Sequence, residues 1–149
     1  MKIGYPCINQ SLSCRSSRTF RLRSYTDERL LLTVTENLRC LEDILRYNAD
    51  HGILFFRITS DLVPFASHPV CTADWQDAFR EDFAALGTFI REREMRISMH
   101  PDQFILLNAK DPEVFGRSVH ELAYHAEVLD LLNLDMTAKI QLHIGGGLR

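Results

Sequence analysis

The chain has 149 residues, of which 46% are hydrophobic and 25% are charged, and its net charge is −3. These values exclude a low-complexity chain and a surface that attracts nucleic acid as a whole, and they fit one globular core. The apolar runs fall far below the roughly 20 residues of a membrane span. Because the N-terminus also lacks the apolar segment of a signal peptide, a cytoplasmic protein without membrane contact is expected.

The N-terminal third predicts a strand, a polar loop and a helix. Residues 2–8 are expected to be extended, although Pro6 weakens the end of that strand. After an arginine-rich loop, Thr26 is expected to cap a helix that Gly52 ends. Apolar residues spaced three and four apart mark its buried face: Leu31, Val34, Leu38, Leu41 and Leu45.

The same alternation continues along the chain. Strands are predicted at 53–59, 96–99 and 139–143, the last of them ended by the glycines at 145–147. A helix after the loop 60–71 has Trp75, Phe79, Phe83, Leu86 and Ile90 on one face. Asp111 and Pro112 start a further helix, expected to bury Phe115, Val119, Leu122, Ala126 and Leu129.

Alternating strands and helices predict an α/β fold with a parallel sheet and right-handed crossovers. A doubly wound open sheet and a TIM barrel both satisfy this pattern. The sequence contains neither a dinucleotide fingerprint nor a P-loop, which favours the barrel. A barrel takes roughly 250 residues, so 1–149 is expected to be one domain: the N-terminal half, truncated before the second half and not closed by this chain alone. Its open sheet edges would allow self-association.

The four cysteines, Cys7, Cys14, Cys40 and Cys71, match no zinc or redox spacing. With no secretory signal, free thiols are expected.

A basic segment follows the first strand. Arg15, Arg18, Arg21 and Arg23 lie within nine residues that contain no acid. Such a patch can bind phosphates even on an acidic protein, although on charge alone a solvated loop is an equally good interpretation.

Three of the six histidines fall where a barrel gathers its functional groups, at the carboxyl ends of strands. His68 lies in the loop after the second strand, and His100 and His143 close the third and fourth. A single histidine at such a place is more often structural, but three at one edge can converge on a zinc, manganese or iron ion. The remaining histidines, His51, His120 and His125, fall on helices or a helix end and are expected to be surface or packing residues.

Two further pairs have a functional and a structural interpretation. Gln103 and Phe104 place an amide and an aromatic ring beyond His100, which suits a wedge that enters a base stack. From the residues alone, Phe104 more simply packs inward with the apolar run to Leu107. Tyr5 and Asn9 at the end of the first strand could touch a ligand, although a tyrosine there is more often part of the core.

Several ordered motifs together resemble the UV damage endonuclease family, over residues 1 to about 146. They are Gly4–Asn9, Thr19–Arg21, Phe56–Ser60, Val63–Pro69, Ser98–Phe104 and Leu142–Gly146. The resemblance implies a TIM barrel that nicks double-stranded DNA on the 5′ side of UV photoproducts, cyclobutane dimers and six-four products, with a cluster of divalent metal ions, commonly manganese.

The resemblance also implies roles for individual residues. His100 and His143 match metal ligands, and His68 matches a catalytic-site histidine that binds metal or phosphate. Gln103 and Phe104 match two residues that probe the duplex at the lesion, where the family usually has a tyrosine in the second position. Residues expected to contact DNA are thus Tyr5, Asn9, Arg15, Arg18, Arg21, Gln103 and Phe104.

The family's remaining ligands, carboxylates and further histidines, come from strands beyond this sequence. The chain alone is therefore expected to bind metal weakly and to cut little or nothing. Two alternatives stay open. A sugar isomerase or abasic-site endonuclease of the related metal-dependent barrels would share strand-end histidines but would not need Gln103, Phe104 or the arginine loop. The other is a non-catalytic fragment.

Overall fold

The structure is a computed structural model and describes residues 1–143. Its centre is a four-stranded parallel sheet in the order β1-β2-β3-β4. The strands are short: β1 (Gly4–Pro6), β2 (Phe55–Ile58), β3 (Arg96–Met99) and β4 (Lys139–Ile140). Each strand therefore pairs with the next one along the chain, and the order never reverses as it does in a doubly wound sheet.

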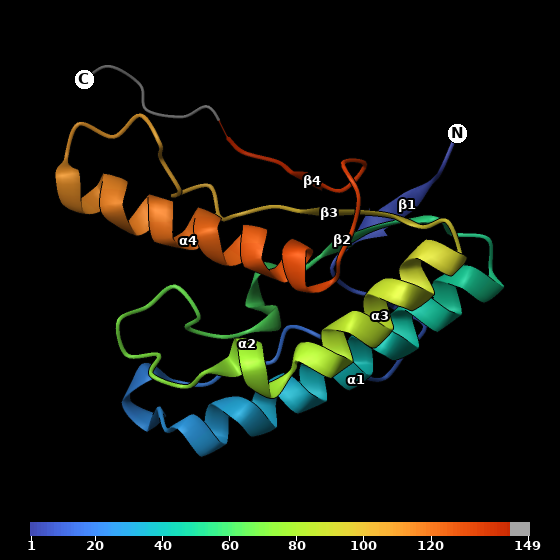
Figure 1. Ribbon diagram of the computed structural model, residues 1–149, viewed down its shortest axis with the longest axis horizontal. Helices are drawn as coiled ribbons and strands as arrows, with labels where there is room; N and C mark the ends of the chain where they lie inside the picture. Colours follow the sequence, from blue (N-terminus) through green and yellow to red (C-terminus); the bar gives the residue numbers. More distant parts are fainter. Residues whose placement is uncertain (144–149) are drawn as a thin grey trace.

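The helices cover one face of this sheet (Figure 1). They are α1 (Asp27–Asp50), α2 (Trp75–Ala78), α3 (Arg80–Glu92) and α4 (Pro112–Leu131), with 3-10 turns η1 (Leu22–Ser24) and η2 (Ser60–Leu62). Side chains on the helical face of the strands, such as Phe56 and Met99, are fully buried, whereas Arg96 on the opposite face is exposed. Consecutive parallel strands with helices on one side form a partial, unclosed barrel, so the TIM-barrel-type prediction is confirmed.

The first helix follows the prediction closely. Thr26 caps α1 by accepting a hydrogen bond from the backbone N–H of Arg29 at 3.1 Å. Gly52, just beyond the helix end, has φ +68°, a left-handed conformation that glycine adopts without strain. The predicted stripe is confirmed except at Leu31, which is only partly buried, because Val34, Leu38, Leu41 and Leu45 are all buried.

The second predicted helix is divided at Phe79, whose φ of −116° lies outside the helical range. Asp74 caps the short α2 by accepting from the N–H of Asp77 at 3.0 Å, and α3 follows. The predicted apolar face is confirmed on both sides of this break. Trp75, Phe79, Phe83, Leu86 and Ile90 all lie in the core.

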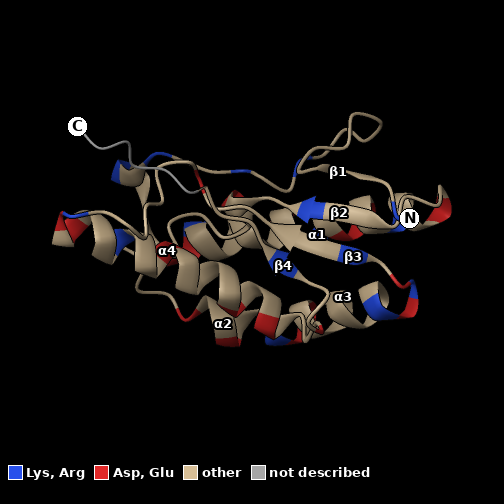
Figure 2. Cartoon of the chain, turned by 90° about the horizontal axis from the view of Figure 1, so that it is seen from above, with Lys and Arg blue, Asp and Glu red and all other residues tan. Residues whose placement is uncertain are grey.

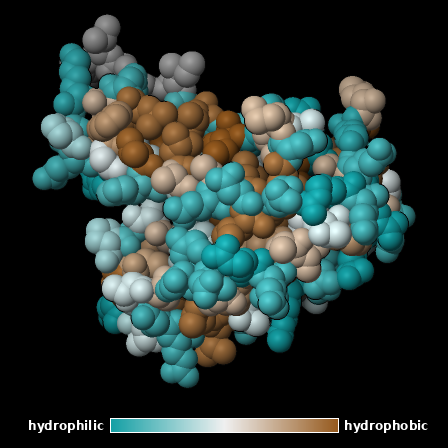
Figure 3. All heavy atoms as spheres, viewed as in Figure 1, coloured by the Kyte–Doolittle hydropathy of each residue, from teal (hydrophilic) through white to brown (hydrophobic). Residues whose placement is uncertain are grey.

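The predicted buried face of α4 is wrong. Asp111 caps this helix as expected, but Phe115 is 45% and Val119 40% exposed, and Leu122, Ala126 and Leu129 are only partly buried. The face that packs instead carries Ser118, Tyr124, His125 and Val128. Polar groups can occupy that face because hydrogen bonds satisfy them: the Ser118 hydroxyl donates to Val114 O and accepts from Leu106 N. Figure 3 shows hydrophobic side chains gathered on the surface at the end of the molecule where α4 begins.

The prediction of four free thiols is wrong for two of them. Cys14 and Cys40 form a disulfide, with their Cα atoms 5.8 Å apart, while Cys7 and Cys71 are free. The N-terminal loop crosses back over α1 and so brings together two cysteines 26 residues apart. Their spacing along the sequence does not encode this contact.

Within residues 1–143, no helix combines the length and the apolar character that crossing a membrane requires.

Candidate functional site

The loops that follow the strands leave from the carboxyl ends of the strands, which lie together and are called the carboxyl edge of the sheet here (Figure 1). In the parallel register Ile58 lies beside Met99, and Met99 beside Ile140. The residues that follow these positions therefore start at the same level of the sheet, as they do at the functional end of a barrel. This edge carries His100 directly after β3 and His143 three residues after β4.

His100 and His143 meet at this edge. Their ring centroids are 4.6 Å apart, with the ring planes at 71°. His100 Nδ1 lies 2.6 Å from the carbonyl oxygen of Pro101, which can only accept, so Nδ1 carries the proton. The lone pair of neutral His100 is thus on Nε2, the atom that a metal ion would use. The prediction that these two imidazoles come together is confirmed.

His68 does not join them. Within the described chain no group of three or more His, Cys, Asp or Glu side chains could hold a metal ion, so the expected three-histidine convergence is wrong. His68 is exposed, and its Nδ1 accepts from the N–H of Val70 at 3.0 Å. The loop is held elsewhere, because Phe65 packs edge-on against Phe20 and Tyr25 of the arginine-rich segment.

Three charged side chains lie at or near this edge: the carboxylates of Asp61 and Asp102 and the guanidinium group of Arg57. The pKa of Asp61 is raised by loss of solvation and by the negative charge of Asp102. Burial raises the pKa of the Cys7 thiol, an effect that the nearby charge of Arg57 partly offsets.

Arg57 and Ser98 are paired in register on neighbouring strands, and Arg57 Nε and Ser98 Oγ are buried without a hydrogen-bond partner among residues 1–143. Figure 2 shows the basic residues that β2, β3 and β4 carry.

A buried polar network behind His100 was not anticipated. Ser60 follows β2, and its hydroxyl donates to the His100 carbonyl oxygen at 2.6 Å. The Tyr124 hydroxyl donates to Ser60 O at 2.9 Å and accepts from Val63 N at 3.0 Å. His125 Nε2 lies 3.1 Å from the Ser60 hydroxyl oxygen, and its Nδ1 lies 2.7 Å from Glu121 O. His125 was expected to be a surface or packing residue. It is buried, and the one sequence signal for this was its seven-residue spacing from Ser118, which places both on one helix face.

Burial lowers the pKa of His125. The carbonyl group and the carboxylate of Glu121 act in the opposite direction, and the charge of His100 adds to the lowering. His125 is therefore a neutral buried imidazole close to the strand-end pair.

Tyr5 and Asn9 are bonded inside the molecule. The Tyr5 hydroxyl donates to Asn48 Oδ1 of α1, and Asn9 Nδ2 donates to the Tyr5 hydroxyl, both at 2.6 Å. Asn9 is only 5% exposed, and its Oδ1 accepts from Ser11 N. These contacts fix the start of the N-terminal loop on α1. Contact of Tyr5 or Asn9 with DNA stays a prediction.

The arginine-rich loop has a fixed backbone and exposed side chains. Asn37 of α1 holds Arg18 by accepting from its N–H at 2.9 Å and donating to its carbonyl oxygen at 3.0 Å. The Arg18 guanidinium pairs with Glu36 at 2.9 Å, and both side chains are exposed. Arg15 and Arg21 are also exposed. The backbone of the loop is thus fixed on α1 at Arg18, and its arginine side chains are exposed.

Gln103 and Phe104 project from the loop after β3. Gln103 is exposed and Phe104 is 72% exposed, so inward packing of Phe104 is wrong. The Asp102 carboxylate accepts from the Phe104 N–H at 3.1 Å, a local turn that directs the ring away from the core.

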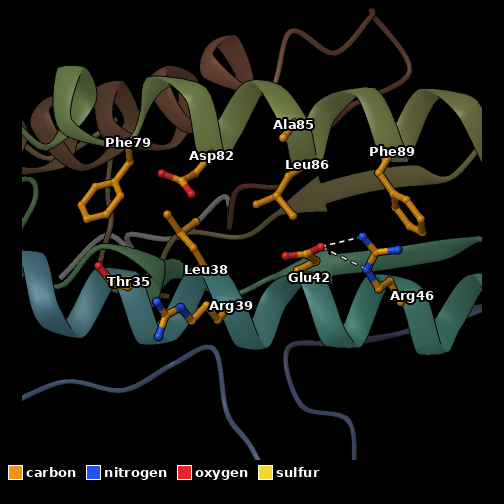
Figure 4. Close-up of a pocket in the computed structure, with 10 residues that line it drawn as sticks. All are labelled: Thr35, Leu38, Arg39, Glu42, Arg46, Phe79, Asp82, Ala85, Leu86 and Phe89. Carbon is orange, nitrogen blue, oxygen red and sulfur yellow. Dashed lines mark hydrogen bonds and ion pairs between the residues drawn. The ribbon is translucent and has the colours of Figure 1, made fainter.

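A groove on the outer face lies between α1 and α3 (Figure 4). The Glu42 carboxylate accepts two hydrogen bonds from Arg46 there, at 2.7 and 3.0 Å. None of the predicted site residues lines this groove, so it belongs to the packing of the two helices and not to the strand-end site.

Comparison with known proteins matches all of residues 1–149 to the family described as UV-endonuclease UvdE. Two similar proteins are UV DNA damage endonucleases. The one from Clostridium perfringens (strain 13 / Type A) is 38% identical over 146 residues, covering 98% of this chain and 35% of the relative. The one from Bacillus anthracis (strain A0248) is 30% identical over 154 residues, covering 98% of this chain and 49% of the relative.

Among solved structures, the crystal structure of SacUVDE superposes with a TM-score of 0.94 at 43% sequence identity. The match covers 98% of this chain and 50% of SacUVDE. The chain thus spans between about a third and a half of the length of these similar proteins.

Proposed function

The chain belongs to the UV-endonuclease UvdE family, and from this premise we propose that it is the first half of a DNA repair endonuclease. The proposed enzyme nicks double-stranded DNA on the 5′ side of UV photoproducts, cyclobutane dimers and six-four products, with divalent metal ions, of which manganese is the first to test. The observation that carries the proposal is the contact between His100 and His143 at the edge of the sheet where barrels hold their active sites.

The histidine pair fits a divalent metal ion in part. Two imidazoles at this distance can share an ion, and the free Nε2 of His100 is a suitable donor. Residues 1–143 contain no third ligand in the same group, so this chain would supply two ligands and other segments would supply the rest. A bound divalent ion would activate water and stabilise the oxygens of the displaced phosphodiester. The role of His100 and His143 is to hold and orient it.

His68 suits a phosphate contact better than metal ligation. Because its Nδ1 accepts a backbone hydrogen bond, neutral His68 carries its proton on Nε2. An exposed N–H donor on the loop after β2 can bind a phosphate oxygen of the DNA backbone. This geometry favours the phosphate role among the two that family resemblance leaves open.

Damage recognition is assigned to Gln103 and Phe104. The exposed ring of Phe104 can take the place of a displaced base in the stack, and the Gln103 amide can hydrogen-bond to base edges. A photoproduct is bent and poorly stacked, so opening the duplex there costs less than opening intact DNA. Arg15, Arg18 and Arg21 would bind backbone phosphates without sequence preference.

Duplex binding tests the recognition step. We expect the chain to bind a UV-irradiated duplex more tightly than the same duplex before irradiation, measured by fluorescence anisotropy at fixed salt. Gln103→Ala should reduce this ratio while leaving Mn²⁺ binding unchanged, and His120→Ala on the exposed side of α4 is the matched control. Equal affinity of the wild-type chain for both duplexes would contradict the recognition role, and an equal loss of discrimination and metal binding would contradict the role of Gln103.

Two alternatives give different results. A sugar isomerase of the related barrels would bind the UV-irradiated and the intact duplex equally, whereas the proposed function predicts a preference for the irradiated one. A non-catalytic piece that pairs through its open sheet edges would form dimers or larger species in light scattering and would show no preference for damaged duplex.

A further inference from the structure

We propose that Ser60 is a positioning residue for His100, held in place by Tyr124 and His125 of α4. The inference rests on the proposed function, because it assigns a purpose to the exact placement of a metal-binding histidine. On this proposal, α4 and the sheet together fix the histidine pair at the carboxyl edge.

The hydrogen-bond ladder of β3 ends just before His100. The carbonyl oxygen of Met99 accepts from Gln141 N at 2.9 Å and is thereby tied to the β4 side. His100 is the next residue, and the following Pro101 has no N–H with which to continue a ladder. Among the described contacts, the His100 carbonyl accepts its hydrogen bond from Ser60. The Ser60 hydrogen bond therefore fixes the backbone one residue beyond the ladder, at the residue that carries the imidazole.

Ser60 is itself fixed from two directions. It is the first residue of η2, separated from the end of β2 by Thr59, and the Tyr124 hydroxyl donates to its carbonyl oxygen at 2.9 Å. Tyr124 is held in turn by the N–H of Val63, which donates to its hydroxyl at 3.0 Å. Tyr124 is 3% exposed, so these bonds are shielded from competing water.

His125 completes the surroundings of the Ser60 hydroxyl. Its Nδ1 faces the carbonyl oxygen of Glu121, which can only accept, so in the neutral ring Nδ1 carries the proton and Nε2 has the lone pair. The single Ser60 hydroxyl proton then has two acceptors, the His100 carbonyl at 2.6 Å and His125 Nε2 at 3.1 Å. The nearer acceptor takes it, and His125 packs behind the bond and excludes water.

Positioning matters because the two rings belong to different strands. The contact between His100 and His143 depends on the direction in which the His100 backbone leaves β3. Loss of the Ser60 bond would free that peptide group to rotate, and the pair would separate without any change in the histidines themselves. Partners of metal ligands commonly change metal affinity by 10–100-fold in this way.

The test follows the histidine rings by NMR in four chains: wild type, Ser60→Ala, Ser60→Thr and His120→Ala. Without metal, we expect an NOE between the ring protons of His100 and His143 in the wild type, its loss in Ser60→Ala, and its return in Ser60→Thr, which restores the hydroxyl. His120→Ala changes an exposed histidine of the same helix and should retain the NOE. The concentration of Mn²⁺ that broadens the His100 ring should rise about tenfold in Ser60→Ala alone.

An unchanged NOE and an unchanged Mn²⁺ midpoint in Ser60→Ala would overturn the proposal, as would an equal loss in Ser60→Ala and Ser60→Thr. Failure of the proposed function looks different: the wild-type rings would ignore Mn²⁺ while the Ser60-dependent NOE persisted. If circular dichroism shows that Ser60→Ala is unfolded, Tyr124→Phe takes its place, since it removes one hydroxyl and both of its hydrogen bonds. A retained NOE in folded Tyr124→Phe would then count against the proposal.

Discussion

Two regions of this molecule differ in how fully they are packed. Helices α1 and α3 bury their apolar stripes against β1, β2 and β3, and their core residues are almost completely shielded from solvent. The region from residue 100 to 143 contributes Val128 and Leu132 to the core, but it also buries a serine, a tyrosine and a histidine and leaves Phe104, Phe115 and Val119 exposed. The first region is organised by hydrophobic burial. The second combines apolar burial with hydrogen bonds of buried polar side chains, and Tyr124 and His125 make theirs in the network behind His100.

The largest expected difference between the two regions is in stability. Leu41 is fully buried in α1, and Leu41→Ala should lower the free energy of unfolding by about 2–5 kcal/mol through lost burial and the cavity left behind. Val119→Ala in α4 should cost less than about 1 kcal/mol, because that side chain is 40% exposed. Urea denaturation of both variants measures this. Comparable losses would mean that the outer face of α4 is packed in solution.

The disulfide gives the next largest effect. Reduction of the bond between Cys14 and Cys40 should lower stability by about 3 kcal/mol, because the unfolded chain regains the freedom of the closed loop. Cys14→Ser should reproduce this loss and become insensitive to reductant, while Cys71→Ser, at a free cysteine, serves as the control. Identical unfolding curves with and without reductant would show that the two thiols are not bonded.

A smaller effect separates the regions by pH. In the folded chain the pKa of His125 lies below its ordinary value of about 6.5, so the unfolded state binds more protons as the pH falls past that value. Stability should therefore be complete above about pH 6.5 and decline below it, until His125 also protonates in the folded chain. The charged and titratable groups facing His125 are Glu121 and His100.

His125→Gln should flatten the decline between pH 7 and 5, measured by urea unfolding at each pH. The exposed His120, changed to Gln, should leave the slope as it is in the wild type. An unchanged slope in His125→Gln would show that another group causes the loss.

The smallest stability effect belongs to the arginine loop. Arg18→Ala breaks an exposed ion pair with Glu36 and should cost at most about 1 kcal/mol. On the proposed function it should still weaken duplex binding equally for damaged and intact DNA, and lower the slope of log affinity against log salt by about 1. Titrations at several salt concentrations test this. A loss confined to damaged DNA would assign Arg18 to recognition instead.

The sequence was informative where a helix has one apolar face and a recognisable cap. Thr26, Gly52 and the spacing from Val34 to Leu45 sufficed for α1. For α4 the cap at Asp111 was correct but the buried face was not, because Phe115 and Val119 suggest one apolar stripe while Tyr124 and Val128 belong to another. Periodicity alone cannot decide which stripe packs when hydrogen bonds allow polar residues to be buried.

For the site, the rule that functional groups gather at strand ends placed His100 and His143 together, and it failed for His68. Strands fix the positions of their last residues, whereas a long loop such as 60–71 takes its path from tertiary contacts, here Phe65 against Phe20. The Ser60 network and the disulfide at Cys14 were missed for the same reason, since both join residues that only the folded chain brings together.

The proposed function depends on one physical event, the binding of a divalent ion by the two strand-end imidazoles. A Mn²⁺ titration of the wild-type chain, followed by paramagnetic broadening of the six histidine ring signals, tests it directly. We predict that His100 and His143 broaden together, at Mn²⁺ concentrations that leave His51 and His120 sharp. Simultaneous broadening of all exposed histidines, or a response of His100 without His143, would contradict the metal site.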